Sequence, residues 1–383
     1  MKRAGGLISA IGERKNLALA VWRAARGKRD QESTRAYIED LEANFAAFRE
    51  GLDAGDRTFD FGNFTSFKIR DPKERMIQAP RFSVRVAHHA IMNVCEPEFE
   101  RALIDDTYAC RAGKGTQAAA LRGLHFTREF PWFLQMDIRK YFDSVDHEVL
   151  LRLLARRFKD RSLLNLFRRI IAAYETRPGK GLPIGSLMSQ HFANFYLNPV
   201  DRLAKERLRL RGYVRYMDDS VVWAGTKAEL EFARDSIRAF LAEELKLELK
   251  DVTRIGRSSS GVQFVGFRVR PRGLDLARST RRRARRRLRA QLRKFEANRM
   301  TERDWQIRLE TAVALARRTG REDAPRQFFG NLTLWEPAWE REPGSPRREL
   351  ERHREEPAMR VSQLEPPSER ERQPGIPSRS SSD

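Results

Sequence analysis

The chain has 383 residues and carries 75 Lys and Arg against 53 Asp and Glu, a net charge of +22. Such a basic surface attracts polyanions, above all nucleic acid, with an affinity that depends on salt. Cys95 and Cys110 lack CxxC spacing, so neither a disulfide framework nor a structural zinc site is expected. No apolar run reaches the length of a membrane span and no secretory signal precedes the first helix. A cytoplasmic protein with no membrane partner is therefore expected.

Apolar spacing predicts helices over much of residues 1–50, including one from Ala36 to Phe48. A strand is expected at Phe64–Ile69, and a helix at Arg81–Glu98 that ends at Pro97. Tyr108–Thr116 is a basic, Gly-containing loop that leads into a further helix, and its Lys114 and backbone amides could hold a phosphate.

Two adjacent carboxylates stand at Tyr216-Met217-Asp218-Asp219, between two apolar and β-branched runs. This pattern predicts a hairpin whose tight turn carries the acids. Neighbouring carboxylates repel each other. A bound divalent cation would offset this repulsion, and Mg²⁺ prefers hard oxygen ligands such as carboxylates. A solvated turn is the alternative for the hairpin taken alone.

A third acid follows the apolar run Phe133–Met136. A strand that ends at Asp137 would bring this carboxylate close to Asp218 and Asp219. Three carboxylates from two neighbouring strands suit a pair of Mg²⁺ ions about 3.5–4 Å apart, as in in-line nucleotidyl transfer. Asp137 could instead cap the helix that begins near His147, but Asp146 fills that position better.

Five segments, in order, resemble the motifs of reverse transcriptases. Asp137 with Tyr141-Phe142-Asp143 resembles the first palm motif, and Tyr216–Asp219 resembles the YxDD box. The other three segments are Phe67–Ile77 (fingers), Leu182–Gln190 (template and nucleotide) and Phe264-Val265-Gly266-Phe267 (primer grip). The resemblance covers about residues 60–270. It implies an α+β right-hand polymerase with fingers, a ferredoxin-like palm and a helical thumb.

The expected domains are N-terminal helices and fingers at 1–130, a palm at 131–270 and a basic helical thumb at 271–335. Residues 156–185 are expected to return from the palm to the fingers. The thumb prediction depends on Arg278–Lys294, which contains ten Lys or Arg and no acid along a helical apolar edge. Residues 336–383 hold 8 of the 17 prolines and are expected to form a disordered tail.

The resemblance also assigns site residues. Asp137, Asp218 and Asp219 would hold two Mg²⁺ ions, with Mn²⁺ as a substitute, and Ile138 would contact metal and nucleotide. Lys73 and Arg75 would clamp the triphosphate. Phe142, with Tyr141 as the competing aromatic, would exclude a 2′-hydroxyl. Gln190 and Tyr216 would line the nucleotide pocket, and Lys250, with Lys246 as the alternative, would protonate pyrophosphate as general acid.

The template motif reads Ile184-Gly185-Ser186-Leu187-Met188-Ser189-Gln190, which is similar to the IGxxxSQ pattern of diversity-generating retroelements. That resemblance implies copying of a template-repeat RNA, with errors at adenines, by a prokaryotic or phage-encoded enzyme. The expected partners are template RNA, primer or cDNA, dNTPs and a small basic accessory protein. The alternatives are a compact group-II-intron-like, retron or defence-associated reverse transcriptase, or a nucleic-acid-binding protein without activity.

Overall fold

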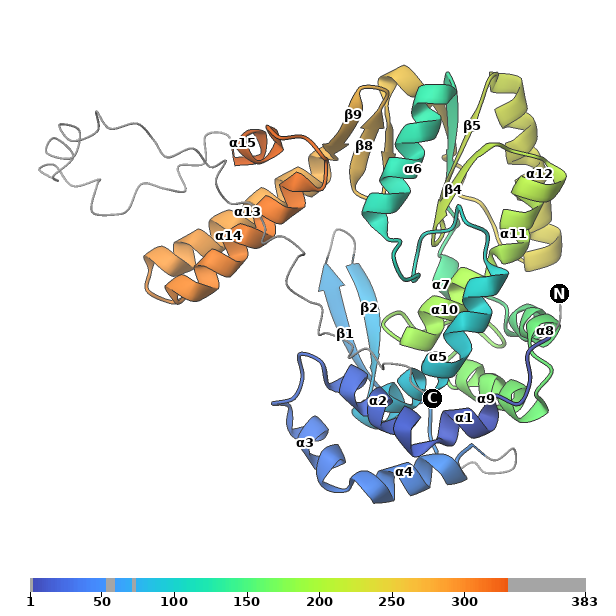
Figure 1. Ribbon diagram of the computed structural model, residues 1–383. Helices are drawn as coiled ribbons and strands as arrows, with labels where there is room; N and C mark the ends of the chain where they lie inside the picture. The colour runs from blue at the N-terminus through green and yellow to red at the C-terminus, as the bar shows by residue number, and fades with distance from the viewer. Residues whose placement is uncertain (1–2, 53–58, 71–73, 330–383) are drawn as a thin grey trace, which may run out of the picture.

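The computed structural model describes residues 3–52, 59–70 and 74–329, and it mixes helices with three antiparallel sheets (Figure 1). The α+β fold class predicted from the sequence is confirmed. The N-terminal helices are α1 (Ile8–Gly12), α2 (Arg14–Ala25), α3 (Glu32–Glu39), α4 (Leu41–Glu50) and α5 (Phe82–Ala102). The strands are β1 (Phe64–Arg70), β2 (Glu74–Pro80), β3 (Trp132–Met136), β4 (Gly212–Tyr216), β5 (Asp219–Ala224), β6 (Arg254–Arg257), β7 (Val262–Phe264), β8 (Phe267–Arg270) and β9 (Gly273–Leu276).

The remaining helices follow the strands in chain order. Those of the middle of the chain are α6 (Thr116–Glu129), α7 (Tyr141–Ser144), α8 (His147–Arg157), α9 (Arg161–Ala172), α10 (Leu187–Tyr196), α11 (Asn198–Arg202), the π-helical η1 (Leu203–Arg207), α12 (Lys227–Leu245) and the 3₁₀ turn η2 (Ser258–Ser260). The last three are α13 (Arg278–Glu296), α14 (Glu302–Arg317) and α15 (Ala324–Phe329). Among the described residues, no helix is both long and apolar enough to cross a membrane.

The central sheet has the strand order β4-β5-β3-β6, and all its pairings are antiparallel. Phe133 and Trp223 are fully buried in it, which explains the apolar character of β3 and β5. Trp223 donates from Nε1 to the Thr127 hydroxyl on α6 (3.1 Å). Gly123 of α6 lies against the same ring, and a Cβ at this position would be only 3.3 Å from it. α6 and α12 pack against this sheet and hold it in place (Figure 1).

The second sheet, β7-β8-β9, contains the hairpin that was predicted at Phe264–Phe267. Its two turn residues, Val265 and Gly266, have φ angles of 44° and 88°, the positive values that a two-residue turn needs. Phe267 and Val269 are buried in the cluster that also includes residues of α6. The alternate side chains of β8, Arg268 and Arg270, therefore lie on the other face of this sheet.

Two predicted helices have different bounds in the structure. α5 continues past Pro97 to Ala102, because Phe99 is buried and its ring packs against the rings of Phe158 and Phe192. This tertiary packing offsets the loss of the one helix hydrogen bond that a proline cannot make. The helix predicted from Ala36 to Phe48 is two helices, since Asp40 leaves the helical region (φ −101°, ψ 37°) between α3 and α4.

Asp146 caps α8, as predicted. Its carboxylate accepts a hydrogen bond from the Val149 amide (3.1 Å) and lies 2.9 Å from the Lys246 ammonium. Lys246, the alternative to Lys250 as general acid, therefore pairs with Asp146 and not with Asp137, Asp218 or Asp219. Cys95 and Cys110 are free thiols, in agreement with the sequence.

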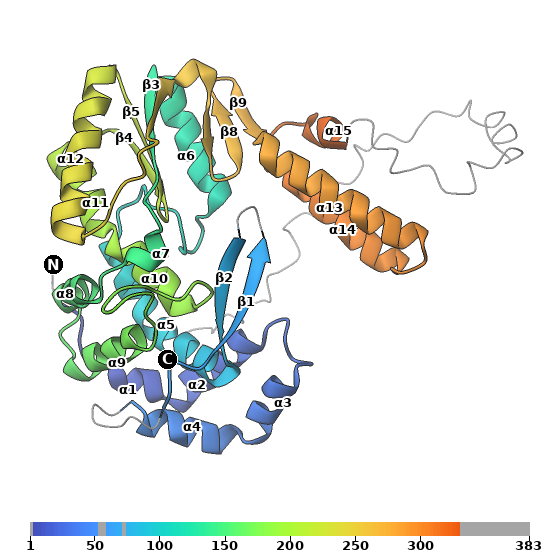
Figure 2. The ribbon, with the colours of Figure 1, turned by 180° about the vertical axis from the view of Figure 1, so that it is seen from behind.

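α13 and α14 form an arm that projects from the body of the molecule, beginning at the end of β9 (Figure 1). Phe295 stacks on Trp305 with ring centroids 5.8 Å apart, and Leu288 is buried between the helices. In both views α15 lies on the side of the arm away from the β1–β2 hairpin (Figures 1 and 2). The helix predicted from the basic run Arg278–Lys294 is confirmed as α13. The expected tail at 336–383 lies outside the described residues.

A buried histidine makes the fold sensitive to acid. Burial, and secondarily the neighbouring His89, lowers the pKa of His88 to about 3. Unfolding restores an ordinary pKa near 6.5, so the unfolded chain binds one more proton than the folded chain between these values. The stabilisation from neutral His88 is therefore complete above about pH 6.5 and is lost as pH falls toward 3.

We expect the free energy of unfolding to fall by about 1.5 kcal/mol between pH 6.5 and 5 from this residue alone. Urea unfolding at several pH values measures it, and His88→Leu should have a flatter pH dependence than the parent chain. His125→Leu is the control, because that side chain is 59% exposed on α6. Equal slopes in the parent chain and His88→Leu would contradict the prediction.

Candidate active site

The two adjacent acids lie in a β-hairpin, as the sequence predicted. β4 and β5 pair up to Tyr216 and Asp219, so Met217 and Asp218 form the two-residue turn and Asp219 begins β5. Met217 has a φ of 56°, a conformation that is strained for a residue with a side chain. Strain of this kind persists only where surrounding contacts enforce it.

Those contacts come from Arg215, which is 2% exposed. Its guanidinium makes two 2.6 Å hydrogen bonds to the Asp201 carboxylate and donates to the Met217 carbonyl at 2.9 Å. It also donates to the side chain and carbonyl of Asn194 on α10, at 2.9 and 3.0 Å. Tyr213 donates to the same Asp201 (2.8 Å), so the buried charges are fully hydrogen-bonded. This network fixes the turn that presents Asp218.

Asp137 lies immediately after β3, beside the hairpin. The pairing of β3 with β5 ends at Met136 and Ser220. The residues beyond this pair are Asp137, just after β3, and Asp219, the first residue of β5. The register of the central sheet therefore brings the third acid to the same edge as the other two. α7, which follows Asp137, lies at the end of the sheet that faces the β1–β2 hairpin (Figures 1 and 2).

Lys250 is placed at this edge by backbone pairing. Its amide donates to the Asp137 carbonyl (2.9 Å), and the Arg139 amide donates to the Glu248 carbonyl (2.8 Å). The Lys250 ammonium forms an ion pair with the Asp137 carboxylate, and both side chains are more than a third exposed. Ile138, which was predicted to contact metal and nucleotide, lies between these two backbone bonds with its side chain buried. Neither bond uses its carbonyl group.

Burial and the proximity of the three acids shift the pKa values of two of them. Burial, followed by the charges of Asp137 and Asp218, raises the pKa of Asp219 to about 7, although a hydrogen bond from Gln135 acts against this shift. Burial and the charge of Asp137 also raise the pKa of Asp218, against the opposing effects of Lys250 and Arg75. Carboxylates that are costly to ionise together favour a cation between them.

The acids at this edge could supply part of the coordination shell of a metal ion, but not all of it. Within the described residues, no three His, Cys, Asp or Glu side chains come close enough to enclose a metal ion by themselves. Mg²⁺ is commonly held by one or two carboxylates together with substrate phosphates and water. Asp218 and Asp219 fit that role, while Asp137 pairs with Lys250 in this structure.

Gln135 links the acids to the Phe264–Phe267 hairpin. Its side-chain amide lies 3.3 Å from the Asp219 carboxylate and donates to the Gln263 carbonyl at 2.7 Å. Gln135 therefore bridges Asp219 and the backbone of β7.

The predicted triphosphate contacts lie on the β1–β2 hairpin. Arg75 is exposed on β2, opposite Ile69, and is close enough to the acids for its charge to lower the pKa of Asp218. The structure thus brings Arg75 toward the same edge as the carboxylates. Lys73 lies outside the described residues.

The two candidate aromatics at the sugar position have different environments. Tyr141 is 3% exposed, and its hydroxyl donates to the Ala193 carbonyl, so its ring belongs to the core. Phe142 is partly exposed and packs edge-on against Tyr141, with ring centroids 5.7 Å apart. Phe142 is therefore the more exposed of the two rings.

The template motif forms a loop against β2. The Gln78 amide donates to the Ile184 carbonyl (2.8 Å), and Gly185 has a φ of 115° with a Cβ position only 2.8 Å from the Ile77 side chain. Only glycine fits there. Ser186 caps α10, whose first turns carry the exposed Gln190.

The structure gives Gln190 and Tyr216, the two residues predicted to line a nucleotide pocket, different surroundings, and Tyr216 does not line the cavity that contains Gln190. Gln190 lines a cavity of about 280 Å³ together with Lys28, Arg85 and His89. Tyr216 is partly buried at the end of β4, opposite Asp219.

Sequence reasoning missed Arg215, Asp201 and Gln135. A signal was present for Arg215, because a charged residue stood at an inward position of an otherwise apolar strand. Asp201 and Gln135 gave no comparable signal, since their partners are distant in the sequence.

The chain is similar in sequence to curated proteins. The chain is 27% identical over 242 residues to Protein YkfC of Escherichia coli, covering 51% of this chain and 63% of that protein. It is 22% identical over 277 residues to the group II intron-encoded protein LtrA of Lactococcus lactis subsp. cremoris, covering 54% and 46%. The chain therefore spans less than two thirds of the length of either relative.

Among solved structures, apo telomerase from Candida tropicalis matches with a TM-score of 0.47 and 13% identity, covering 77% of this chain and 63% of that one. The sequence model of the family described as "Reverse transcriptase (RNA-dependent DNA polymerase)" matches residues 68–269, which is more than half of the chain and includes all three acids. The chain belongs to the reverse transcriptase family.

Proposed function

We propose that this chain is an RNA-directed DNA polymerase that extends a primer on an RNA template. The observation that carries the proposal is the meeting of Asp137, Asp218 and Asp219 at one edge of the central sheet, within a family match that spans all three. The net charge of +22 supports a nucleic-acid substrate. In this proposal the β1–β2 hairpin belongs to the fingers, the central sheet is the palm and the α13–α14 arm is the thumb.

Each residue then has a chemical role. Asp218 and Asp219, with Asp137, would hold Mg²⁺, which when bound supplies activation of the 3′-hydroxyl and charge stabilisation at the phosphates. Arg75 would orient the triphosphate through its planar fork. Lys250 is held beside the acids by its backbone bond to Asp137, and its ammonium would give a proton to departing pyrophosphate. Phe142 would exclude a 2′-hydroxyl by contact.

Primer extension on poly(rA)/oligo(dT) tests the proposal directly. The purified chain should incorporate dTTP in the presence of Mg²⁺ and stop when EDTA removes the metal. Mn²⁺ should substitute in part. RNA binding without any extension in either metal would favour the alternative of a nucleic-acid-binding protein.

Within the family, we propose the diversity-generating group, which copies a template-repeat RNA with the help of a small basic accessory protein. The support is the segment from Ile184 to Gln190, whose pattern IGxxxSQ forms the loop against β2 and the start of α10. A compact group-II-intron-like, retron or defence-associated enzyme is the second candidate. The match to the group II intron-encoded protein LtrA favours the group-II-intron-like enzyme among these.

Fidelity separates these two candidates. A pocket that discriminates base pairs less well loses about tenfold in accuracy for each 1.4 kcal/mol of transition-state energy. We expect cDNA copied from an RNA template, with accessory protein where required, to carry frequent substitutions opposite adenines and few elsewhere. Sequencing of single cDNA molecules measures this, and uniformly low error at all four bases would assign the chain to the group-II-like candidate.

A further inference from the structure

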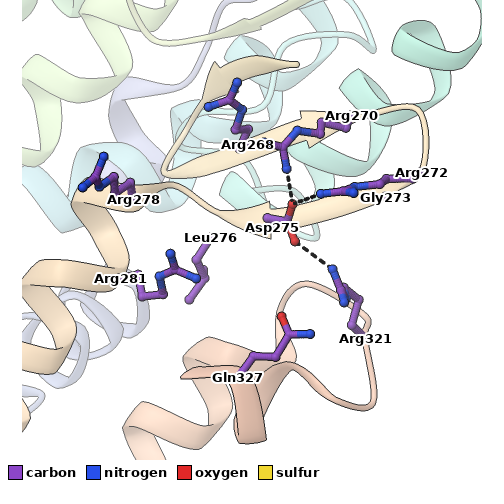
Figure 3. A pocket seen from close by; sticks show the side chains of 10 residues that line it. All are labelled: Arg268, Arg270, Arg272, Gly273, Asp275, Leu276, Arg278, Arg281, Arg321 and Gln327. Carbon is purple, nitrogen blue, oxygen red and sulfur yellow. Dashed lines mark hydrogen bonds and ion pairs between the residues drawn. The ribbon is translucent and has the colours of Figure 1, made fainter. Parts of the chain in front are cut away.

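A cavity of about 670 Å³ lies where the arm joins the β7-β8-β9 sheet (Figure 3). β8, β9, the start of α13 and the segment around α15 all contribute to its wall. Its charged lining residues are Arg268, Arg270, Arg272, Asp275, Arg278, Arg281 and Arg321. The lining thus contains six arginines and one carboxylate, and we call this cavity the arginine pocket.

Asp275 organises one side of the arginine pocket. It lies 2.7 Å from Arg270, 2.9 Å from Arg321 and 3.9 Å from Arg272, so one carboxylate holds guanidinium groups from β8 and from the segment before α15 (Figure 3). These contacts satisfy only part of the positive charge. Arg321 also pairs with Asp323 at 3.0 Å, so six arginines face two carboxylates, and four positive charges in excess remain around the cavity.

The other side of the arginine pocket is not neutralised. Among the residues that the structure describes, no ion pair or hydrogen bond involves the side chain of Arg278 or Arg281, and both are exposed. The Nε of Arg268 is buried without a partner. α13 also begins without a side-chain cap or an acid in its first turn, so its first amides add positive potential at Arg278.

The chemistry of the lining selects for phosphate. Every cation in the arginine pocket is arginine, whose planar fork matches phosphate oxygens in pairs. The groups converge from strand, helix and loop, and a string of phosphates can meet several of them at once. Exposed arginines continue from this pocket along α13, at Arg282, Arg286 and Arg289.

The arginine pocket is separate from the proposed polymerase site. α15, which helps to form the pocket, lies on one side of the arm, and the β1–β2 hairpin with Arg75 lies on the other (Figures 1 and 2). A template–primer duplex held between the arm and the hairpin would leave the pocket open. Asp137, Asp218 and Asp219 lie at the edge of the central sheet and do not line the arginine pocket.

We propose that the arginine pocket binds the phosphate backbone of a second nucleic-acid segment, outside the template–primer duplex. It would hold a folded part of the RNA while the catalytic edge copies another part. The proposal rests on the proposed function only in expecting a nucleic-acid partner, since binding at this pocket requires no polymerase chemistry.

The test uses the full chain, with the polymerase site first saturated by poly(rA)/oligo(dT). A labelled RNA hairpin is the probe, and a DNA hairpin of the same sequence distinguishes the two sources of phosphodiester. The variant Arg272→Gln/Arg278→Gln/Arg281→Gln removes three charges and leaves the Arg270 and Arg321 contacts to Asp275 in place.

The matched control is Arg207→Gln/Arg209→Gln/Arg238→Gln, three exposed arginines on η1, the segment after it and α12. Arg238 has an ion pair of 3.9 Å with Asp235, the same length as that of Arg272 with Asp275, so both variants lose equivalent contacts.

We expect the parent chain and the control to bind the hairpin while template–primer is bound. The pocket variant should bind it at least about tenfold more weakly, with a salt dependence reduced by about three phosphate contacts. As a second measurement without mutation, the RNA hairpin should protect Arg278 and Arg281 from phenylglyoxal in the saturated parent chain.

Three outcomes would overturn the proposal: equal weakening in the control, complete displacement of the hairpin by template–primer, or equally good competition by poly-glutamate. The last would identify the arginine pocket as a site for an acidic protein. Loss of primer extension in the parent chain together with normal hairpin binding would instead overturn the proposed function and leave the arginine pocket standing.

Discussion

Asp218→Ala should reduce Mg²⁺-dependent DNA synthesis at least about a thousandfold while leaving RNA affinity nearly unchanged. Loss of a metal ligand removes several kcal/mol of transition-state stabilisation, and each 1.4 kcal/mol corresponds to a factor of ten in rate. Affinity for RNA depends mainly on phosphate contacts with the basic surface, which the substitution does not touch. Single-nucleotide primer extension and a filter-binding measurement on the same preparation separate the two effects.

Asp137→Ala should have the same outcome for a related reason. It removes one carboxylate of the set and also the partner of Lys250, whose ammonium is ion-paired with Asp137 in the structure. Asp235→Ala is the control, because that carboxylate lies on α12 and pairs with Arg234. Polymerisation by either active-site variant at a rate near that of the control would remove the two-metal assignment.

Phe142→Val should raise incorporation of rNTPs relative to dNTPs by roughly tenfold to a hundredfold, the range for a contact worth about 1–3 kcal/mol. The reason is steric: a ring that excludes the 2′-hydroxyl discriminates by repulsion, and a smaller side chain removes the repulsion without weakening dNTP binding. Competition between each rNTP and its dNTP in single-nucleotide extension gives the ratio.

Two further substitutions make the sugar experiment specific. Phe232→Val makes the same chemical change on α12, where the ring is 68% exposed, and should leave the ratio unaltered. Tyr141→Val tests the competing aromatic, although burial of this side chain predicts a loss of stability as well. A shift in the ratio for Tyr141→Val, with none for Phe142→Val, would identify Tyr141 as the discriminating ring.

The local parts of the site could be read from the sequence because their signals are local. Apolar alternation on both sides of Met217 and Asp218 predicts a hairpin, and the basic run from Arg278 with its apolar edge predicts a helix. Asp137 could be placed near the hairpin because an acid that ends a buried strand lies at the edge of the sheet. The order of the motifs was enough to indicate the family.

The tertiary structure alone decided how these parts are held and what else they form. The strain at Met217 is enforced by Arg215, whose partner Asp201 is a neighbour only through folding. α5 passes Pro97 because rings from distant helices bury Phe99. The arginine pocket brings together residues from Arg268 to Gln327, and their spacing along the chain does not predict that they meet. Local propensity determines which elements form, whereas the contacts among them depend on chain closure over long separations, which short sequence patterns do not encode.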